Sequence, residues 1–225
     1  MKLPHVFFII YFLVIGLCIA QQPTPSATPR IPGMESANVV MGKGGGRDLH
    51  AELDWPTNPP KLPMPAIISI HGGGWLSAEY QPNGARIFVN QGYFTMACEY
   101  RSDKESKWPA QIEDCKLAVR WLRANAAKYN VDPNRIGVWG GSAGGHLAAL
   151  LGTTENHPEF EGSGGYPGVS SKVQAVIDSF GPTDLRDGTC TTGSPTTNEE
   201  GRADMLDVVS QLFDKKYSEH PELWA

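Results

Sequence analysis

Residues 135–151 read RIGVWGGSAGGHLAALL, and this stretch decides the fold. The apolar run Ile136 to Trp139 predicts a short buried strand, and the segment from Ala143 to Leu151 predicts a helix. The turn between them, Gly140 to Gly144, has the pattern G-x-S-x-G. A serine on such a strand-to-helix turn has a strained backbone and holds its hydroxyl clear of the sheet. The sequence therefore predicts Ser142 as a nucleophile.

The glycines around Ser142 are the second requirement of such a turn. It closes only if the residues two before and two after the serine lack side chains, and Gly140 and Gly144 meet that condition. A helix that begins at Ala143 also places the positive end of its dipole beneath the hydroxyl. The alternative is a glycine-rich turn with an incidental serine, because the pattern alone is short. The strand before it and the helix after it favour the nucleophile.

A second motif, HGGGW at residues 71–75, directly follows the apolar run Ala66 to Ile70. That run suits a strand that is covered on both faces. Three glycines let the backbone pass close to a substrate carbonyl with its amides pointing inward. We expect the amides of Gly73 and Gly74, together with that of Ala143, to stabilise an oxyanion.

The other residues of this loop are predicted to support it. His71 is interpreted as a packing and hydrogen-bonding anchor rather than a catalytic base, and Gly72 as part of the close-approaching backbone. Trp75 is expected to border the acyl pocket. A phosphate-binding loop is the alternative for such a glycine run, but the Lys and Ser/Thr of a P-loop are missing.

Strands alternate with helices along the chain, which predicts βαβ units and a mostly parallel sheet with helices on both faces. Turn residues and apolar runs predict the remaining elements. These are a hairpin around Gly42 to Gly46, a helix at Ala85 to Gln91 ended by Gly92, strands at Phe94 to Tyr100 and Val173 to Phe180, and a last helix at Glu199 to Tyr217. Gly152 is expected to end the helix after Ser142.

The clearest predicted helix begins at Pro109, a residue suited to a first turn. Asn130 is expected to end it, and the chain is expected to turn at Asp132 to Asn134. Apolar residues recur along it at helical spacing and form one stripe: Ile112, Cys115, Val119, Leu122 and Ala126. The basic residues between them are expected to face away from the core. They are Lys116, Arg120 and Arg123.

The N-terminus has the composition of an export signal. Lys2 precedes an apolar stretch that is too short for a comfortable membrane span, and Ala20 supplies a small residue before a cut. We therefore predict a signal peptide at 1–20 and a secreted or periplasmic protein, against the alternatives of an uncleaved anchor or lipid attachment at Cys18. Residues 21–36 are predicted to be a Pro/Thr/Ser-rich linker, and 37–225 one domain.

Composition narrows the possible partners. The chain has 225 residues and a net charge of −5 without a basic cluster, so nucleic acid is not an expected partner. Cys98 and Cys115 are expected to be buried as small hydrophobic residues, and Cys190 lies in a polar loop. No cysteine has the spacing of a metal site, so a metal is not predicted. The oligomeric state is not indicated.

The two motifs, together with EYR at 99–101, PAQIED at 109–114 and FGPTD at 180–184, resemble the α/β-hydrolase fold-3 esterases. The similarity extends over about residues 40–225. It is greatest to the branch of feruloyl- and acetyl-esterase-like and hormone-sensitive-lipase-like enzymes. The resemblance implies an α/β-hydrolase fold and a cofactor-free carboxylic-ester hydrolase that works through a serine acyl-enzyme.

In this family the catalytic triad runs Ser, Asp, His, with the last two following later strands. No segment after Asp184 matches either position. The resemblance therefore implies that the last strands and helices, and the triad Asp and His, are missing from this chain, which would be inactive by itself. Weak substitutes are Asp178 as acid and His157 or His220 as base. His146, four residues after Ser142 on the same helix, is expected to be structural.

Two other functions stay open at this stage. One is a non-catalytic binding protein with a hydrolase fold, and the other is a serine peptidase related to the prolyl oligopeptidases, although HGGGW favours esters. The predicted substrates are small-molecule or polysaccharide-linked esters, such as acetyl or feruloyl groups of plant polymers. Trp75, Tyr80 and Tyr100 suggest an aromatic-lined pocket.

Overall fold

The computed structural model describes residues 32–78, 82–185, 199–215 and 219. The predicted signal peptide, Tyr80 and Cys190 lie outside these residues, as does His220. No helix among the described residues is long and apolar enough to cross a membrane.

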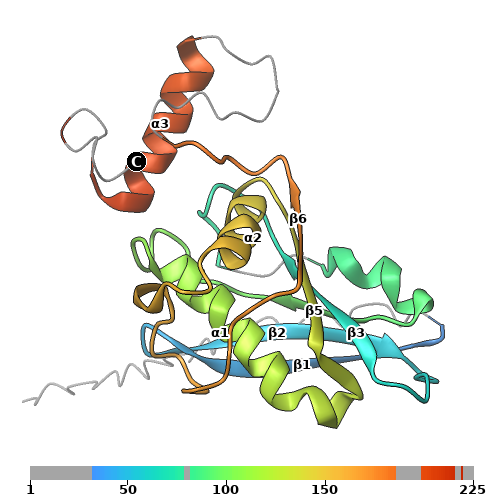
Figure 1. The fold of residues 1–225 in the computed structure, drawn as a ribbon. Helices are drawn as coiled ribbons and strands as arrows, with labels where there is room; N and C mark the ends of the chain where they lie inside the picture. The colour runs from blue at the N-terminus through green and yellow to red at the C-terminus, as the bar shows by residue number, and fades with distance from the viewer. Residues whose placement is uncertain (1–31, 79–81, 186–198, 216–218, 220–225) are drawn as a thin grey trace, which may run out of the picture.

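A six-stranded mixed sheet forms the centre of the fold, in the order β1-β2-β4-β3-β5-β6 (Figure 1). The strands are β1 (Met34–Gly44), β2 (Arg47–Pro56), β3 (Met64–Ile70), β4 (Phe94–Cys98), β5 (Val131–Gly141) and β6 (Ala175–Ser179). The hairpin β1–β2 and the pair β2–β4 are antiparallel. The pairs β4–β3, β3–β5 and β5–β6 are parallel, so the predicted α/β sheet is confirmed.

Helices cover both faces of the sheet. They are η1 (Gly84–Gln91), α1 (Ala110–Asn125), η2 (Ala126–Tyr129), α2 (Ala143–Thr153), η3 (Pro158–Phe160) and α3 (Glu199–Phe213). In Figure 1, α1 and α2 lie together on one side of the sheet, and α3 stands above α2. On the other face, Phe88 of η1 packs against Trp139 of β5, with their ring centroids 6.1 Å apart.

Several element ends follow from the residues that were predicted to set them. Gly92 ends η1 in the left-handed conformation, with φ 86°, and Asn130 ends η2 with φ 53°. β1 begins at Met34, inside the stretch assigned to the linker. Gly152, in contrast, does not end α2, which continues to Thr153. A Cβ at Gly152 would lie 2.7 Å from Val176 Cγ2, so glycine there allows β6 to approach the helix.

The apolar stripe of α1 is buried along its whole length, which confirms the predicted helix and its inner face. Cys98 and Cys115 are both buried free thiols, as expected. The prediction for the basic residues of α1 is wrong. Lys116 is only 1% exposed, and Arg120 is buried as well.

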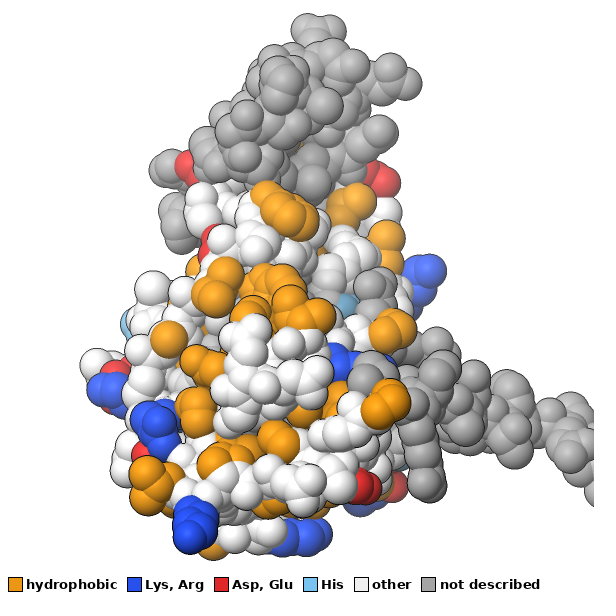
Figure 2. All heavy atoms as spheres, turned by 90° about the vertical axis from the view of Figure 1, so that its right-hand side faces the viewer, with side chains coloured by type: hydrophobic (Ala, Val, Ile, Leu, Met, Phe, Trp, Pro, Cys, Tyr) orange, Lys and Arg blue, Asp and Glu red, His pale blue; other side chains and the backbone are white. Residues whose placement is uncertain are grey.

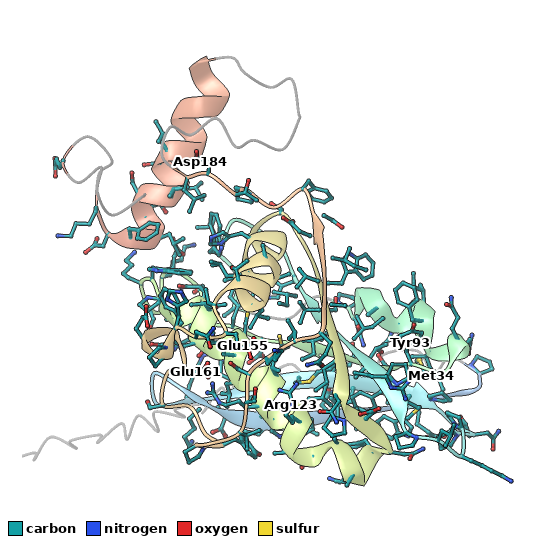
Figure 3. The ribbon with its side chains drawn as sticks, in the orientation of Figure 1. Met34, Tyr93, Arg123, Glu155, Glu161 and Asp184 are labelled. Carbon is teal, nitrogen blue, oxygen red and sulfur yellow. The ribbon has the colours of Figure 1, made fainter. Side chains whose placement is uncertain are left out.

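The reason is the segment 154–172 between α2 and β6, which covers the outer side of α1. Lys116 Nζ donates to the carbonyl oxygen of Thr154 at 2.7 Å and to Glu161 Oε1 at 2.9 Å. Arg120 donates to Glu161 Oε2 at 2.5 Å. Arg123 is half-buried and donates to the carbonyl oxygens of Ser170 and Lys172. Figure 3 shows Glu161 and Arg123 where this segment meets α1. The three cations therefore fasten this segment to α1.

The outer strand of the sheet, β6, exposes apolar side chains. Ile177 is 52% exposed and Phe180, just after the strand, is 67% exposed. A groove of about 350 Å³ lies beside them, lined by Phe88, Trp139 and neighbouring residues. Figure 2 looks onto this side of the molecule and shows hydrophobic side chains gathered across it. Among the described residues, β6 pairs with β5 alone.

Glu161 provides a test of how the segment 154–172 is held. Burial alone would raise the pKa of Glu161, but the hydrogen bond from Ser171 and the charges of Lys116 and Arg120 outweigh it and hold that pKa below its ordinary value. The resulting stabilisation is present above the ordinary pKa and is lost as the pH falls through the lowered one. We expect Glu161→Gln to lower the free energy of unfolding at pH 7 by about 1–3 kcal/mol, because two buried cations lose their partner.

Urea denaturation of the wild-type and Glu161→Gln proteins measures this difference in the free energy of unfolding. The difference should become smaller towards pH 3, where Glu161 is protonated. Glu155→Gln is the matched control. Its carboxylate pairs with Lys172 at 2.9 Å in an exposed position, so removal of that charge should change stability by less than about 1 kcal/mol. Equal effects of the two substitutions would contradict a special role for Glu161.

Candidate active site

Ser142 lies on the turn between β5 and α2, with φ 55° and ψ −126°. A positive φ is unfavourable for a residue with a side chain, and such outliers concentrate at functional sites. The backbone amide of Ser142 donates to the carbonyl oxygen of Ser179 at 3.0 Å, which ties the turn to the end of β6. The backbone therefore has the strained conformation that the elbow motif predicts.

Two glycines make this turn possible. A Cβ at Gly140 would lie 2.1 Å from the carbonyl oxygen of Gly144. A Cβ at Gly144 would lie 2.2 Å from the carbonyl oxygen of Ile70 and 2.6 Å from that of His71. The first turn of α2 therefore rests directly on the end of β3, where the HGGGW loop begins.

Gly144→Ala tests this contact. Because the added methyl would overlap backbone oxygens that cannot move independently, we expect a loss of about 3 kcal/mol or more, or failure to fold. Thermal unfolding followed by circular dichroism measures it.

Gly137→Ala is the control on the strand that precedes the turn. Its Cβ would meet the carbonyl oxygen of Ala175 at 3.5 Å, an ordinary contact, so the cost should stay below about 1 kcal/mol. A Gly144→Ala protein as stable as the Gly137→Ala protein would contradict the packing described.

The HGGGW loop packs on the elbow from the other side. A Cβ at Gly72 would lie 2.8 Å from the carbonyl oxygen of Gly141. Gly73 has φ 105°, Gly74 φ 60° and Trp75 φ 61°, so three successive residues have positive φ. Apart from its chain neighbours, no atom of the described residues lies within 4 Å of the Cβ position of Gly73, so the backbone there faces open space. At residues 73 and 74 glycine adopts these angles without strain, and at residue 73 it leaves this space free.

The amides expected to bind an oxyanion are free of competing partners among the described residues. None of the backbone N–H groups of Gly73, Gly74 and Ala143 donates to another described residue. Ala143 is the first residue of α2, where helical amides have no partner within the helix. The donors predicted from sequence are therefore available on both sides of Ser142.

His71 is held by contacts behind the loop. Its ring stacks on Tyr100, with centroids 4.2 Å apart and planes 10° apart, and the Tyr100 hydroxyl donates to the His71 carbonyl oxygen at 3.0 Å. His71 Nδ1 lies 2.8 Å from the carbonyl oxygen of Gly72, which can only accept, so Nδ1 carries the proton. Burial lowers the pKa of His71. This geometry is that of a neutral loop anchor.

Trp75 and His146 connect the loop to α2, the helix that follows Ser142. Trp75 is 1% exposed, and its ring meets that of His146 edge-on, at 88° with centroids 5.4 Å apart. Trp108 lies on His146 at 5.8 Å. Burial lowers the pKa of His146 to about 4. His146 is therefore a neutral packing residue between two tryptophans.

The lowered pKa of His146 has a consequence for stability. Because the folded-state pKa lies below the ordinary value, the unfolded chain binds the proton first as the pH falls. The contribution of His146 to stability is therefore complete above about pH 6.5 and is lost progressively towards pH 4.

We expect His146→Phe, which keeps an aromatic ring, to flatten this part of the pH dependence of unfolding. Urea titrations at pH 4.5 and pH 7 measure it. His50→Phe is the control, since His50 lies at the surface beside Glu99. If the change in the free energy of unfolding between pH 4.5 and pH 7 is the same in His146→Phe as in the wild type, folding does not lower the pKa of His146.

Of the substitute acid and bases, Asp178 and His157 lie among the described residues, and neither hydrogen-bonds to Ser142. The carboxylate of Asp178 accepts from the backbone amide of Gly181 at 2.7 Å and lies against α2. His157 follows the far end of α2 and pairs with Glu159 at 2.9 Å in an exposed position. α2 thus separates His157 from Ser142. No side chain among the described residues hydrogen-bonds to the Ser142 hydroxyl.

Sequence reasoning missed two side chains that shape this region. Arg101 donates to both oxygens of Asp114 and orders the segment before α1. Trp108 contacts three other aromatic rings, on α2, η3 and α3. The available signal was a tryptophan directly before Pro109, the N-cap residue of α1, because an exposed loop would carry a polar residue at that place.

A family model described as BD-FAE matches residues 53–224. The chain belongs to this family of α/β-hydrolase esterases. The match includes the HGGGW loop, the elbow and α3. It confirms the resemblance that the motifs indicated and the predicted fold class.

Two of the curated relatives are esterases of Mycobacterium tuberculosis. Esterase LipC is 32% identical over 218 residues, which are 90% of this chain and 50% of that protein. Esterase LipQ is 30% identical over 87% of this chain and 46% of its own length. The chain spans about half the length of these relatives.

Solved structures show the same likeness. A truncated form of a carbohydrate esterase from gut microbiota superposes with a TM-score of 0.66 and 30% identity, covering 83% of this chain and 68% of its own. Esterase Est2 of Thermogutta terrifontis superposes with a TM-score of 0.59 and 28% identity, covering 82% of this chain and 63% of its own.

Proposed function

We propose that this chain carries the nucleophile and oxyanion hole of an exported carboxylic-ester hydrolase. The observation that supports this most is the placement of Ser142. Ser142 has a positive φ, and Gly144 lets its turn pack against the end of β3. The backbone of Gly73, in the neighbouring loop, faces open space. Relatives named as esterases support the same chemistry. Export is proposed from residues 1–20.

In the proposed reaction, the Ser142 hydroxyl attacks the ester carbonyl carbon and gives up its proton to a base. The carbonyl oxygen becomes an oxyanion, to which the amides of Gly73, Gly74 and Ala143 donate hydrogen bonds. Each such donor typically contributes about 3 kcal/mol to the transition state. The C–O bond to the alcohol then breaks, the alcohol leaves with a proton, and water hydrolyses the acyl-enzyme.

The proton acceptor is the part of this scheme that the described residues do not supply. His71 and His146 are neutral, packed residues, and His157 lies beyond α2. We propose that the complete protein provides a His and its orienting Asp from other segments. Without them Ser142 stays protonated and is a poor nucleophile at neutral pH. The chemistry itself requires neither metal nor cofactor.

The proposed substrates are esters attached to small molecules or polysaccharides, such as acetyl or feruloyl groups. Support comes from the carbohydrate esterase with the same fold and from the proposed export. Trp75 borders the HGGGW loop, but its ring is buried against His146, so its role at the acyl group is one of packing. A non-catalytic binding protein is the second candidate, favoured by the lack of a base near Ser142 among the described residues.

Hydrolysis of p-nitrophenyl acetate by the product of the complete gene tests the proposal. We expect turnover that falls at least about a thousandfold in Ser142→Ala, because the acyl-enzyme can no longer form. Ser163→Ala, at an exposed serine of the segment 154–172, should leave the rate unchanged. Full activity in Ser142→Ala would contradict the mechanism. A folded product without esterase activity would favour the binding protein, and cleavage of prolyl peptides alone would favour a peptidase.

A further inference from the structure

Helix α3 packs on the body through one apolar side of its last two turns. Val209 and Leu212 are fully buried, and Val208 and Phe213 pack against the same core. In Figure 1 the C-terminal end of α3 points towards the beginning of α1. Residues far apart in sequence therefore meet here, close to the HGGGW loop.

Two residues before α1 bind the C-terminal end of α3. The backbone amide of Trp108 donates to the carbonyl oxygen of Leu212 at 3.0 Å, and Lys107 Nζ donates to that of Gln211 at 2.8 Å. The last carbonyls of a helix have no partner within it and attract a positive charge. Lys107 and Trp108 thus satisfy these carbonyls, and we call this pair the clamp.

The Trp108 ring also contacts α2, the helix that follows Ser142. It contacts Phe213 of α3 at 5.9 Å, Phe160 of η3 at 5.9 Å and His146 of α2 at 5.8 Å. His146 is one helical turn after Ser142. The position of α3 is therefore coupled by direct ring contacts to the helix that carries the nucleophile.

Val208 is the residue of α3 that reaches the HGGGW loop. Its Cγ1 lies 3.5 Å from the Cβ position of Gly74, whereas the described residues other than its chain neighbours leave the Cβ position of Gly73 clear to 4 Å. The space over Gly73 is thus open, and the space over Gly74 is bounded by Val208. A group bound at the amides of both glycines must fit beside this side chain.

We propose that Val208 determines the size of the acyl group that the esterase accepts, and that Trp108 is a positioning residue that holds α3 in place for this purpose. The inference rests on the proposed function. A valine at this distance admits a short acyl chain and excludes a longer one by direct contact. A smaller side chain at residue 208 would enlarge the space over Gly74, and a larger side chain would reduce it.

The test uses the complete gene product and p-nitrophenyl esters of acetate, butyrate, hexanoate and octanoate. In Val208→Ala we expect the ratio of kcat/KM for octanoate to that for acetate to rise about tenfold or more, because one extra methylene alone is worth about tenfold or more in a pocket. In Val208→Phe the ratio should fall. Asp207→Ala, at the exposed neighbouring position of α3, should leave it unchanged.

Hydrogen exchange tests the positioning role of Trp108 without relying on activity, and it can be measured on the 225-residue chain. We expect Trp108→Ala to speed exchange of the α3 amides at 206–213 at least tenfold, and Trp108→Phe to restore most of the protection. In the complete protein Trp108→Ala should flatten the acyl-length profile more than it lowers kcat for acetate.

The outcomes separate this inference from the proposed function. If Ser142 is required but a folded Val208→Ala protein keeps the wild-type acyl-length ratio, the specificity role of Val208 is wrong and the proposed function stands. Unchanged α3 exchange in Trp108→Ala overturns the positioning role. Full activity in Ser142→Ala removes the proposed function, and this inference with it.

Discussion

The contact between Gly144 and the backbone at the end of β3 is the constraint on which the site depends. Because a side chain at residue 144 would meet the carbonyl oxygens of Ile70 and His71, only glycine lets α2 begin so close to β3. That closeness places Ser142 and the HGGGW loop, which lie far apart in sequence, beside each other. The parallel pairing of β3 with β5 also brings the ends of these two strands, where the loop and the Ser142 turn begin, next to each other.

Around this contact, two polar side chains are buried and hold the loop and α2 in fixed positions. His71 is neutral, stacked on Tyr100 and bonded to its own loop, and His146 is neutral between two tryptophans. An oxyanion hole works because its donors are already oriented before the charge forms. Burial lowers the pKa of both histidines, which favours their neutral form, and their ring contacts hold the HGGGW loop and α2 in place. Among the residues that the structure describes, no side chain hydrogen-bonds to the Ser142 hydroxyl as a base would.

The local elements could be predicted because each depends on residues close in sequence, such as the apolar stripe of α1 or the glycines around Ser142. The errors concern contacts made by distant segments. Lys116 and Arg120 appear solvent-facing from helical spacing, but the segment 154–172 returns over them and supplies Glu161. Gly152 allows β6 to approach α2 instead of ending the helix. Trp108 was missed because its three aromatic neighbours come from three separate elements.

Covalent labelling of Ser142 tests whether this serine is a preorganised nucleophile. The product of the complete gene would be treated with a fluorophosphonate, digested and analysed by mass spectrometry. The account predicts one adduct, on the peptide that contains Ser142, and none after Ser142→Ala. A folded, unlabelled Ser142, or a label that persists in Ser142→Ala, would contradict it.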